Sequence, residues 1–110
     1  MKGRVVFLIR TKPEARDRFL DAYESIRHEV AEGVDGHIVD QVCRSPDDPD
    51  SWLITSEWDT LEHFLAWERT QEHRDLAQPL RECMAEATSL KFEVVEETVG
   101  RGAPARDASA

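Results

Sequence analysis

Four stretches of the chain have the apolar patterns of β-strands. The first is continuously apolar from Val5 to Ile9, which is typical of a strand covered on both faces. The third and fourth alternate apolar and polar side chains, as strands with two different faces do. A turn-rich connector over residues 45–50 predicts that the second and third strands form an antiparallel hairpin. The expected strands are residues 4–10, 37–44, 51–58 and 90–97.

The first helical pattern lies between the first two strands. Apolar residues recur at helical spacing from about Pro13 to Glu32, and Gly33 follows as a typical helix terminator. Thr11 and Glu14 have the spacing of a capping box, and Pro13 is tolerated in the first helical turn. We therefore expect one long amphipathic helix here.

A second helical pattern follows the third strand. Asp59 and Glu62 have capping-box spacing at its start. The apolar periodicity is interrupted near Thr70 and Gln71, and Pro79 requires a bend or a restart. The region is therefore expected to consist of two or three helical pieces that end before the last strand.

The order of these elements is βαββαβ, which predicts an α+β, ferredoxin-like fold. In that fold a four-stranded antiparallel sheet has both helical regions on one face. Because the first strand is apolar on both sides, the other face needs a cover, and we predict a homodimer in which two sheets pack face to face. Residues 1–98 form the expected domain, and residues 99–110, which lack large apolar side chains after Val99, are expected to be a disordered tail.

Composition narrows the possible partners and location. The formal net charge of −9, from 23 acidic and 14 basic residues, opposes binding to a nucleic-acid backbone. The sequence contains neither a signal-peptide pattern nor an apolar run long enough to span a membrane, so a cytoplasmic location is expected. Cys43 and Cys83 lack metal-ligand spacing and are interpreted as buried free thiols rather than a disulfide. We expect no metal site, because neither Cys-x-x-Cys nor His-Glu-x-x-His occurs.

The third strand and the helix after it hold all three tryptophans of the chain. In an extended strand Trp52, Ile54, Ser56 and Trp58 share one face, and the helix carrying Trp67 is expected to lie over that face. This arrangement predicts a pocket walled by indole rings, with one hydroxyl group. The alternative is that the same rings are ordinary core residues, which a strand and its covering helix bury in any case.

Three further side chains are candidates for chemistry. His73 lies at the predicted helix break and titrates near neutral pH, so it is a candidate general base, with a surface or capping role as the alternative. Arg10 ends the first strand and either contacts an anionic substrate or pairs with Glu57 or Glu93 across a dimer. His37 begins the second strand and faces either the pocket or the dimer interface.

The chain resembles the antibiotic biosynthesis monooxygenase domain family over about residues 5–95. The residues that carry this resemblance are Ser56-Glu57-Trp58, the helix from Leu61 to Trp67 and the following Glu72-His73-Arg74. The resemblance implies a dimeric α+β barrel. It also implies a class of activity, because members include small oxygenases of aromatic polyketide pathways. These oxidise phenolic or anthrone-like substrates with dioxygen, using neither flavin nor metal.

Individual residues depart from the patterns of two groups in that family. In the cofactor-free oxygenases the tryptophan matched by Trp58 lines the pocket, but Ile54 stands where they usually have an asparagine, so Ser56 is the substitute donor that the resemblance suggests. In the heme-degrading oxygenases a helix tryptophan corresponds to Trp67. Val6 and Ala77 stand at their asparagine and histidine-ligand positions, which argues against heme degradation.

The leading hypothesis is a cofactor-independent monooxygenase that takes a small aromatic substrate and dioxygen. It assigns catalytic roles to His73 and Ser56 and substrate-binding roles to Trp58, Trp67, Ile54, Trp52 and Arg10. The alternatives are a non-oxidative polyketide cyclase and a ligand-binding or accessory protein of the same fold. The missing asparagine favours the cyclase or the ligand-binding protein, whereas an interior without a pocket would favour an accessory protein.

Overall fold

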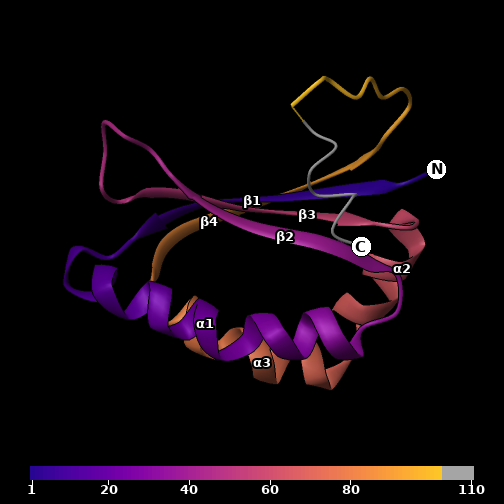
Figure 1. The fold of residues 1–110 in the computed structure, drawn as a ribbon. Coiled ribbons are helices and arrows are strands. Elements are labelled where there is room, and N and C mark those ends of the chain that lie inside the picture. The colour runs from indigo at the N-terminus through magenta and orange to yellow at the C-terminus, as the bar shows by residue number, and fades with distance from the viewer. Residues whose placement is uncertain (103–110) are drawn as a thin grey trace.

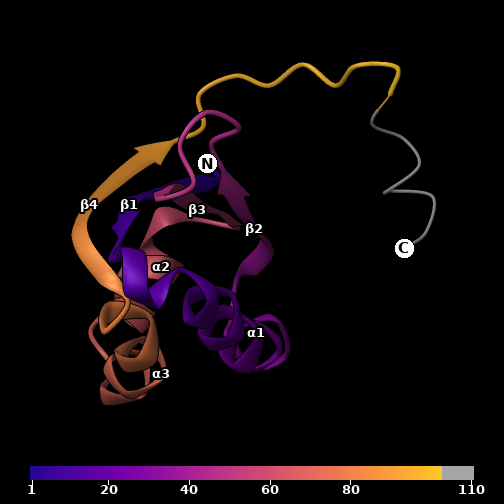
Figure 2. The ribbon, with the colours of Figure 1, turned by 90° about the vertical axis from the view of Figure 1, so that its left-hand side faces the viewer.

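The computed structural model, which describes residues 1–102, confirms the α+β fold (Figure 1). Four antiparallel strands form one sheet in the order β2-β3-β1-β4, with β1 and β3 at its centre. The helices lie on one face of this sheet, and Figure 2 shows the same layers after a 90° turn. The elements are β1 (Gly3–Thr11), the 3-10 turn η1 (Pro13–Ala15), α1 (Arg16–Gly33), β2 (His37–Arg44), β3 (Ser51–Trp58), α2 (Leu61–Glu68), α3 (Gln71–Arg81) and β4 (Met84–Glu93).

Strand register determines which side chains face the helices. Val5 pairs with Ser56 and Phe7 with Ile54, so these residues share the helix-covered face. The residues between them point to the opposite face, on which no element of residues 1–102 packs as a second layer (Figures 1 and 2). We call this second side the open face. Leu8 is 45 % exposed on it and Phe92 is 52 % exposed.

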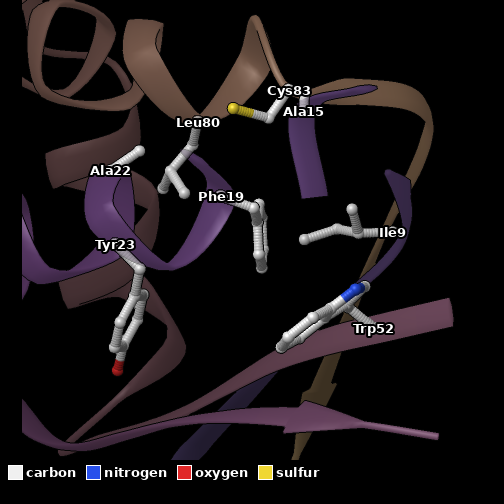
Figure 3. Packing of buried hydrophobic residues seen from close by; sticks show 8 residues of the cluster. All are labelled: Ile9, Ala15, Phe19, Ala22, Tyr23, Trp52, Leu80 and Cys83. Atoms are coloured by element: carbon white, nitrogen blue, oxygen red, sulfur yellow. The ribbon is translucent and has the colours of Figure 1, made fainter. Parts of the chain in front are cut away.

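Two apolar clusters fill the space between the sheet and the helices. One lies under α1 near the turn that joins β2 and β3, and Figure 3 shows the Phe19 ring between Ile9, Trp52 and Leu80. The other is built on Val5, Trp58 and Phe64, with the Trp67 ring packed against it. The domain is therefore packed at both ends of the sheet rather than around one central point.

Both predicted capping boxes are wrong in detail. Thr11 is the buried last residue of β1, and its Oγ1 donates to Asp50 Oδ1 at 3.0 Å instead of capping a helix. Arg16 donates to the same carboxylate through Nε and an Nη atom at 2.9 and 3.0 Å, which fixes the start of α1. At α2 the cap is Thr60 rather than Asp59, and its Oγ1 accepts from the His63 backbone N–H at 3.3 Å.

The last helix and strand also differ from expectation. The predicted interruption is present, because α2 ends at Glu68 and Thr70 caps α3. The predicted break at Pro79 is absent, since that proline lies near the end of α3 and its missing N–H removes one backbone hydrogen bond close to where the helix stops. β4 begins at Met84 instead of residue 90 because it pairs with nearly the whole length of β1.

Several other expectations concern single features. Cys43 and Cys83 are free, but Cys43 is exposed on the open face rather than buried. Among residues 1–102 no helix is long and apolar enough to cross a membrane. Residues 94–100 contain no helix or strand, and most of the predicted tail, residues 103–110, lies outside the described residues.

Candidate functional site

A cavity of about 200 Å³ lies between the sheet and the helices, and it is partly open to solvent. Its walls are mainly apolar, with side chains from all four strands on one side and from all three α-helices on the other. A dry cavity of about 150 Å³ is enough to hold benzene. The space here therefore suits a ring system larger than benzene, and its open side leaves room for further rings.

Two tryptophans form one wall of this cavity. Trp58 at the end of β3 and Trp67 from α2 have ring centroids 6.0 Å apart at 31°. Trp58 is almost fully buried, and its indole Nε1–H donates to Ser56 Oγ at 2.9 Å. Ser56 and Ile54 also line the cavity, as expected from their positions on the same face of the strand. The expected hollow between the third strand and its helices is thus present.

Two nitrogen atoms in this wall are buried without a hydrogen-bond partner among the described residues. They are Trp67 Nε1 and His73 Nδ1. The two rings pack edge to face with centroids 4.6 Å apart, and both line the cavity. Because an unpaired buried donor or acceptor costs about 1–3 kcal/mol, such groups are rare and call for an explanation. A ligand in the cavity that both rings line is able to supply such a partner.

The environment of His73 favours a neutral imidazole. Burial lowers the pKa of His73 below its ordinary value of 6.5, and the positive charges of Arg81 and Arg74 act in the same direction against the opposing effect of Glu68. The side chain is held at the start of α3, where its backbone N–H donates to Thr70 Oγ1 at 3.1 Å. A neutral imidazole facing a cavity is able to accept a proton at neutral pH.

The cavity also has polar groups that sequence reasoning did not assign to it. Tyr23 from α1 and Asp40 from β2 both contribute to its lining. Burial, together with the negative charge of Asp40, raises the pKa of Tyr23 to about 12, so this side chain remains a neutral phenol. Asp40 Oδ1 is 3.0 Å from Nε2 of His37, which is itself buried. In the sequence Tyr23 has the helical spacing of a core residue, and nothing in it marks Asp40 as facing inward.

The remaining predicted site residues lie elsewhere. Trp52 belongs to the cluster under α1, where its ring packs against Phe19 at 5.1 Å and its Nε1–H donates to the Pro49 carbonyl at 2.9 Å. Arg10 points to the open face and pairs with Asp48 at 2.6 Å. Neither residue lines the cavity.

Two further expectations concern the partners of Glu57 and the binding of a metal ion. Glu57 is buried on the open face, and its partners come from the same chain, with Arg4 at 3.1 Å and Lys2 at 3.6 Å. Arg10 is therefore not needed as its partner. Within residues 1–102, no three His, Cys, Asp or Glu side chains are grouped as a metal-binding site.

Comparison with known proteins agrees with this architecture. The profile of the family described as "Antibiotic biosynthesis monooxygenase" matches residues 3–79. The 42.8 kDa protein in the whiE locus of Streptomyces coelicolor is 44 % identical over 108 residues, which cover 97 % of this chain and 27 % of that protein. Polyketide synthase CurD of Streptomyces cyaneus is 38 % identical over 99 residues, covering 90 % and 26 %. The chain thus spans about a quarter of the length of these curated relatives.

A solved structure shows the same fold. SnoaB, a cofactor-independent oxygenase from Streptomyces nogalater, superposes with a TM-score of 0.77 and covers 87 % of this chain and 95 % of its own. At 14 % identity this similarity concerns the fold. The family profile spans well over half of the sequence. The chain therefore belongs to the antibiotic biosynthesis monooxygenase family.

Proposed function

We propose that this chain is a cofactor-independent monooxygenase that oxidises an aromatic, polyketide-like phenol or anthrone with dioxygen. The observation that carries the proposal is the pair of buried nitrogens without partners, Trp67 Nε1 and His73 Nδ1, in the wall of an apolar cavity. One is a fixed donor and the other belongs to an imidazole kept neutral by burial. Together they supply a proton acceptor and an oxyanion donor in a site with mainly apolar walls.

The chemistry needs little more than these groups. His73 takes a proton from the activated C–H of an anthrone, and the carbanion reduces dioxygen and combines with it to form a peroxide. The peroxide takes back the proton and loses water, so that anthrone and dioxygen become quinone and water. The Trp67 N–H donates to the oxyanion while it carries charge. Ser56 Oγ accepts from Trp58, and its own hydroxyl proton remains available as a second donor.

A second candidate function is supported by Ile54. This apolar side chain lines the cavity where related oxygenases usually have an amide, so the donor set for an oxyanion is smaller here. A cyclase, which closes a ring by proton transfer alone, or a binding protein needs fewer such donors. Both candidate functions use the same cavity and differ in the consumption of dioxygen.

Dioxygen uptake distinguishes the two. The substrate is 1,8-dihydroxyanthrone, with a metal chelator present and no flavin, NADPH or other reductant. We expect protein-dependent uptake, above the spontaneous oxidation of the anthrone, with one quinone formed per dioxygen. Activity that appears only with a reductant and a cofactor contradicts the monooxygenase proposal. Ring closure of a polyketide-like substrate without dioxygen uptake supports the cyclase instead.

We also propose that two copies of the chain form a homodimer through the open face. Its centre is apolar, since Val6, Leu8, Leu53 and Leu90 are neighbours across β3, β1 and β4. Leu8 and Phe92 are roughly half exposed there, and pairing two such faces removes them from water. Light scattering of the purified chain tests this proposal, and a mass of one chain at micromolar concentration contradicts it.

A further inference from the structure

An irregularity in β2 brings a histidine to the same side of the sheet as an acidic residue of the cavity lining. The pairing of β2 with β3 shifts in register between His37 and Val39, so Ile38 is an extra residue that bulges out of the ladder and is 45 % exposed. In a regular strand, residues three apart point to opposite faces. Asp40 is in regular register with Ser56, and because of the bulge His37 pairs with Trp58, so both side chains point toward the helices.

The side chain of Asp40 is held in place by His37. The His37 side chain is 3 % exposed and packs edge-on against Trp58, with centroids 5.1 Å apart, while its Nε2 lies 3.0 Å from Asp40 Oδ1. A carboxylate has about four lone-pair positions, of which this contact uses one and the nearby Tyr23 hydroxyl group takes up a second. The groups that face Asp40 from other elements are Tyr23 on α1 and Ser56 on β3. The carboxylate is thus fixed in direction and retains free acceptor positions.

The polar side chains that line the cavity are nitrogen or hydroxyl groups, Arg81 among them, except for one carboxylate. Trp67 and His73 offer an N–H donor and a neutral imidazole, whereas Asp40 is an acceptor that repels ligand oxygens lacking a proton. We propose that Asp40 is a ligand-binding residue that accepts a hydrogen bond from a phenolic hydroxyl group, and that His37 is its positioning residue. This proposal uses the same cavity as the proposed function. It adds a claim about specificity, namely that the cavity binds a free phenol more tightly than the methyl ether of the same phenol.

Binding of 2-naphthol and of 2-methoxynaphthalene tests the proposal without any oxidation. Calorimetric titrations without dioxygen are carried out on the wild-type chain with both compounds. They share the two-ring skeleton, but only the naphthol has a hydroxyl proton. A hydrogen bond to a charged acceptor predicts that naphthol binds about tenfold or more tightly than the ether. Equal binding of the two compounds, or no detectable binding of naphthol, overturns the proposal without reference to any variant.

Four variants, one of them a control, test whether the selectivity comes from Asp40 and His37. Asp40→Asn is expected to remove most of the preference for naphthol and to leave binding of the ether within about twofold, whereas Asp47→Asn, on the exposed turn, is expected to keep it. His37→Phe is expected to reduce the preference, and His37→Gln, which restores an N–H donor, to recover much of it. Loss of affinity for both compounds alike in Asp40→Asn indicates a purely structural role and overturns the proposal.

The two proposals fail in different ways. Naphthol selectivity that depends on Asp40, in a chain that consumes no dioxygen with the anthrone, supports the ligand-binding role and removes the monooxygenase. Dioxygen uptake together with equal binding of naphthol and ether supports the monooxygenase and removes the ligand-binding role of Asp40. The binding and uptake measurements therefore test separate claims about one cavity.

Discussion

The unpaired indole of Trp67 leads to a prediction in which stability and activity change differently. Trp67→Phe removes a buried N–H without a partner, which relieves about 1–3 kcal/mol. It also removes the second ring, which at about 0.8 kcal/mol per CH₂ group costs about 1–2 kcal/mol of buried apolar contact. The two effects largely offset each other, so the free energy of unfolding is expected to lie between about 1 kcal/mol below and about 2 kcal/mol above that of the wild type.

Trp58→Phe is the matched control, because its indole lines the same cavity but has a partner. It loses a similar area and also the hydrogen bond to Ser56 Oγ, which leaves a buried hydroxyl oxygen unpaired. The sum of the two losses is about 2–5 kcal/mol. Urea unfolding followed by far-ultraviolet circular dichroism measures both variants on one scale. Equal destabilisation of the two variants refutes the reasoning, because it means that the Trp67 N–H also has a partner in the free protein.

Activity is expected to rank the same two variants in the opposite order. If the Trp67 N–H stabilises an oxyanion, its removal lowers kcat/KM for anthrone oxidation by about 100-fold, as for other donors of this kind. Trp58→Phe leaves that donor in place and is expected to lower kcat/KM less. A Trp67→Phe variant with wild-type activity contradicts the assigned role.

Three further predictions concern His73, the open face and the turn before β2. Because burial lowers the pKa of His73, the unfolded chain binds more protons below about pH 6.5, so stability falls as the pH drops through this window; His73→Gln removes that part of the slope in urea midpoints. Leu8→Lys is expected to give single chains in light scattering, whereas Leu20→Lys, on α1 and equally exposed, keeps the dimer, and two dimeric variants contradict the interface. Gly36→Ala is expected to cost about 1–3 kcal/mol, because φ is +82° and a Cβ meets a histidine ring at 2.4 Å. Gly33→Ala, with no atom within 4 Å, stabilises by about 0.5–1 kcal/mol, and a thermal melt with both variants alike contradicts this account.

Sequence alone predicted the elements whose signals are local. The alternation from Ser51 to Trp58 determined both the strand and its inward face, and the interruption near Thr70 marked the boundary between α2 and α3. The start of β4 at Met84 was not predictable in this way, because it depends on pairing with β1 far away in the sequence. Thr11 was misassigned for the same reason, since its partner Asp50 is 39 positions later.

The site was predictable in part. Residues on one face of the third strand and on the helix that covers it lie together as expected, and Ile54, Ser56, Trp58, Trp67 and His73 all line the cavity. Asp40 was missed because charged side chains are mostly exposed, and its inward direction depends on the register of β2 against β3. His37 shares that face because of the bulge, which has no clear sequence signal. Trp52 lies on the same face of β3 as Trp58. It is at the opposite end of that strand, however, and packs under α1 instead.

The central claim is that an aromatic ligand binds against Trp58 and Trp67, and the three indole N–H resonances of the chain test it most directly. A titration of ¹⁵N-labelled protein with 2-naphthol is expected to shift the Trp67 resonance most, because that N–H gains a partner, and to shift Trp58 as its neighbour. Trp52 donates to the Pro49 carbonyl outside the cavity, and its resonance is expected to stay in place. Three unchanged resonances, or a shift confined to Trp52, contradict the account.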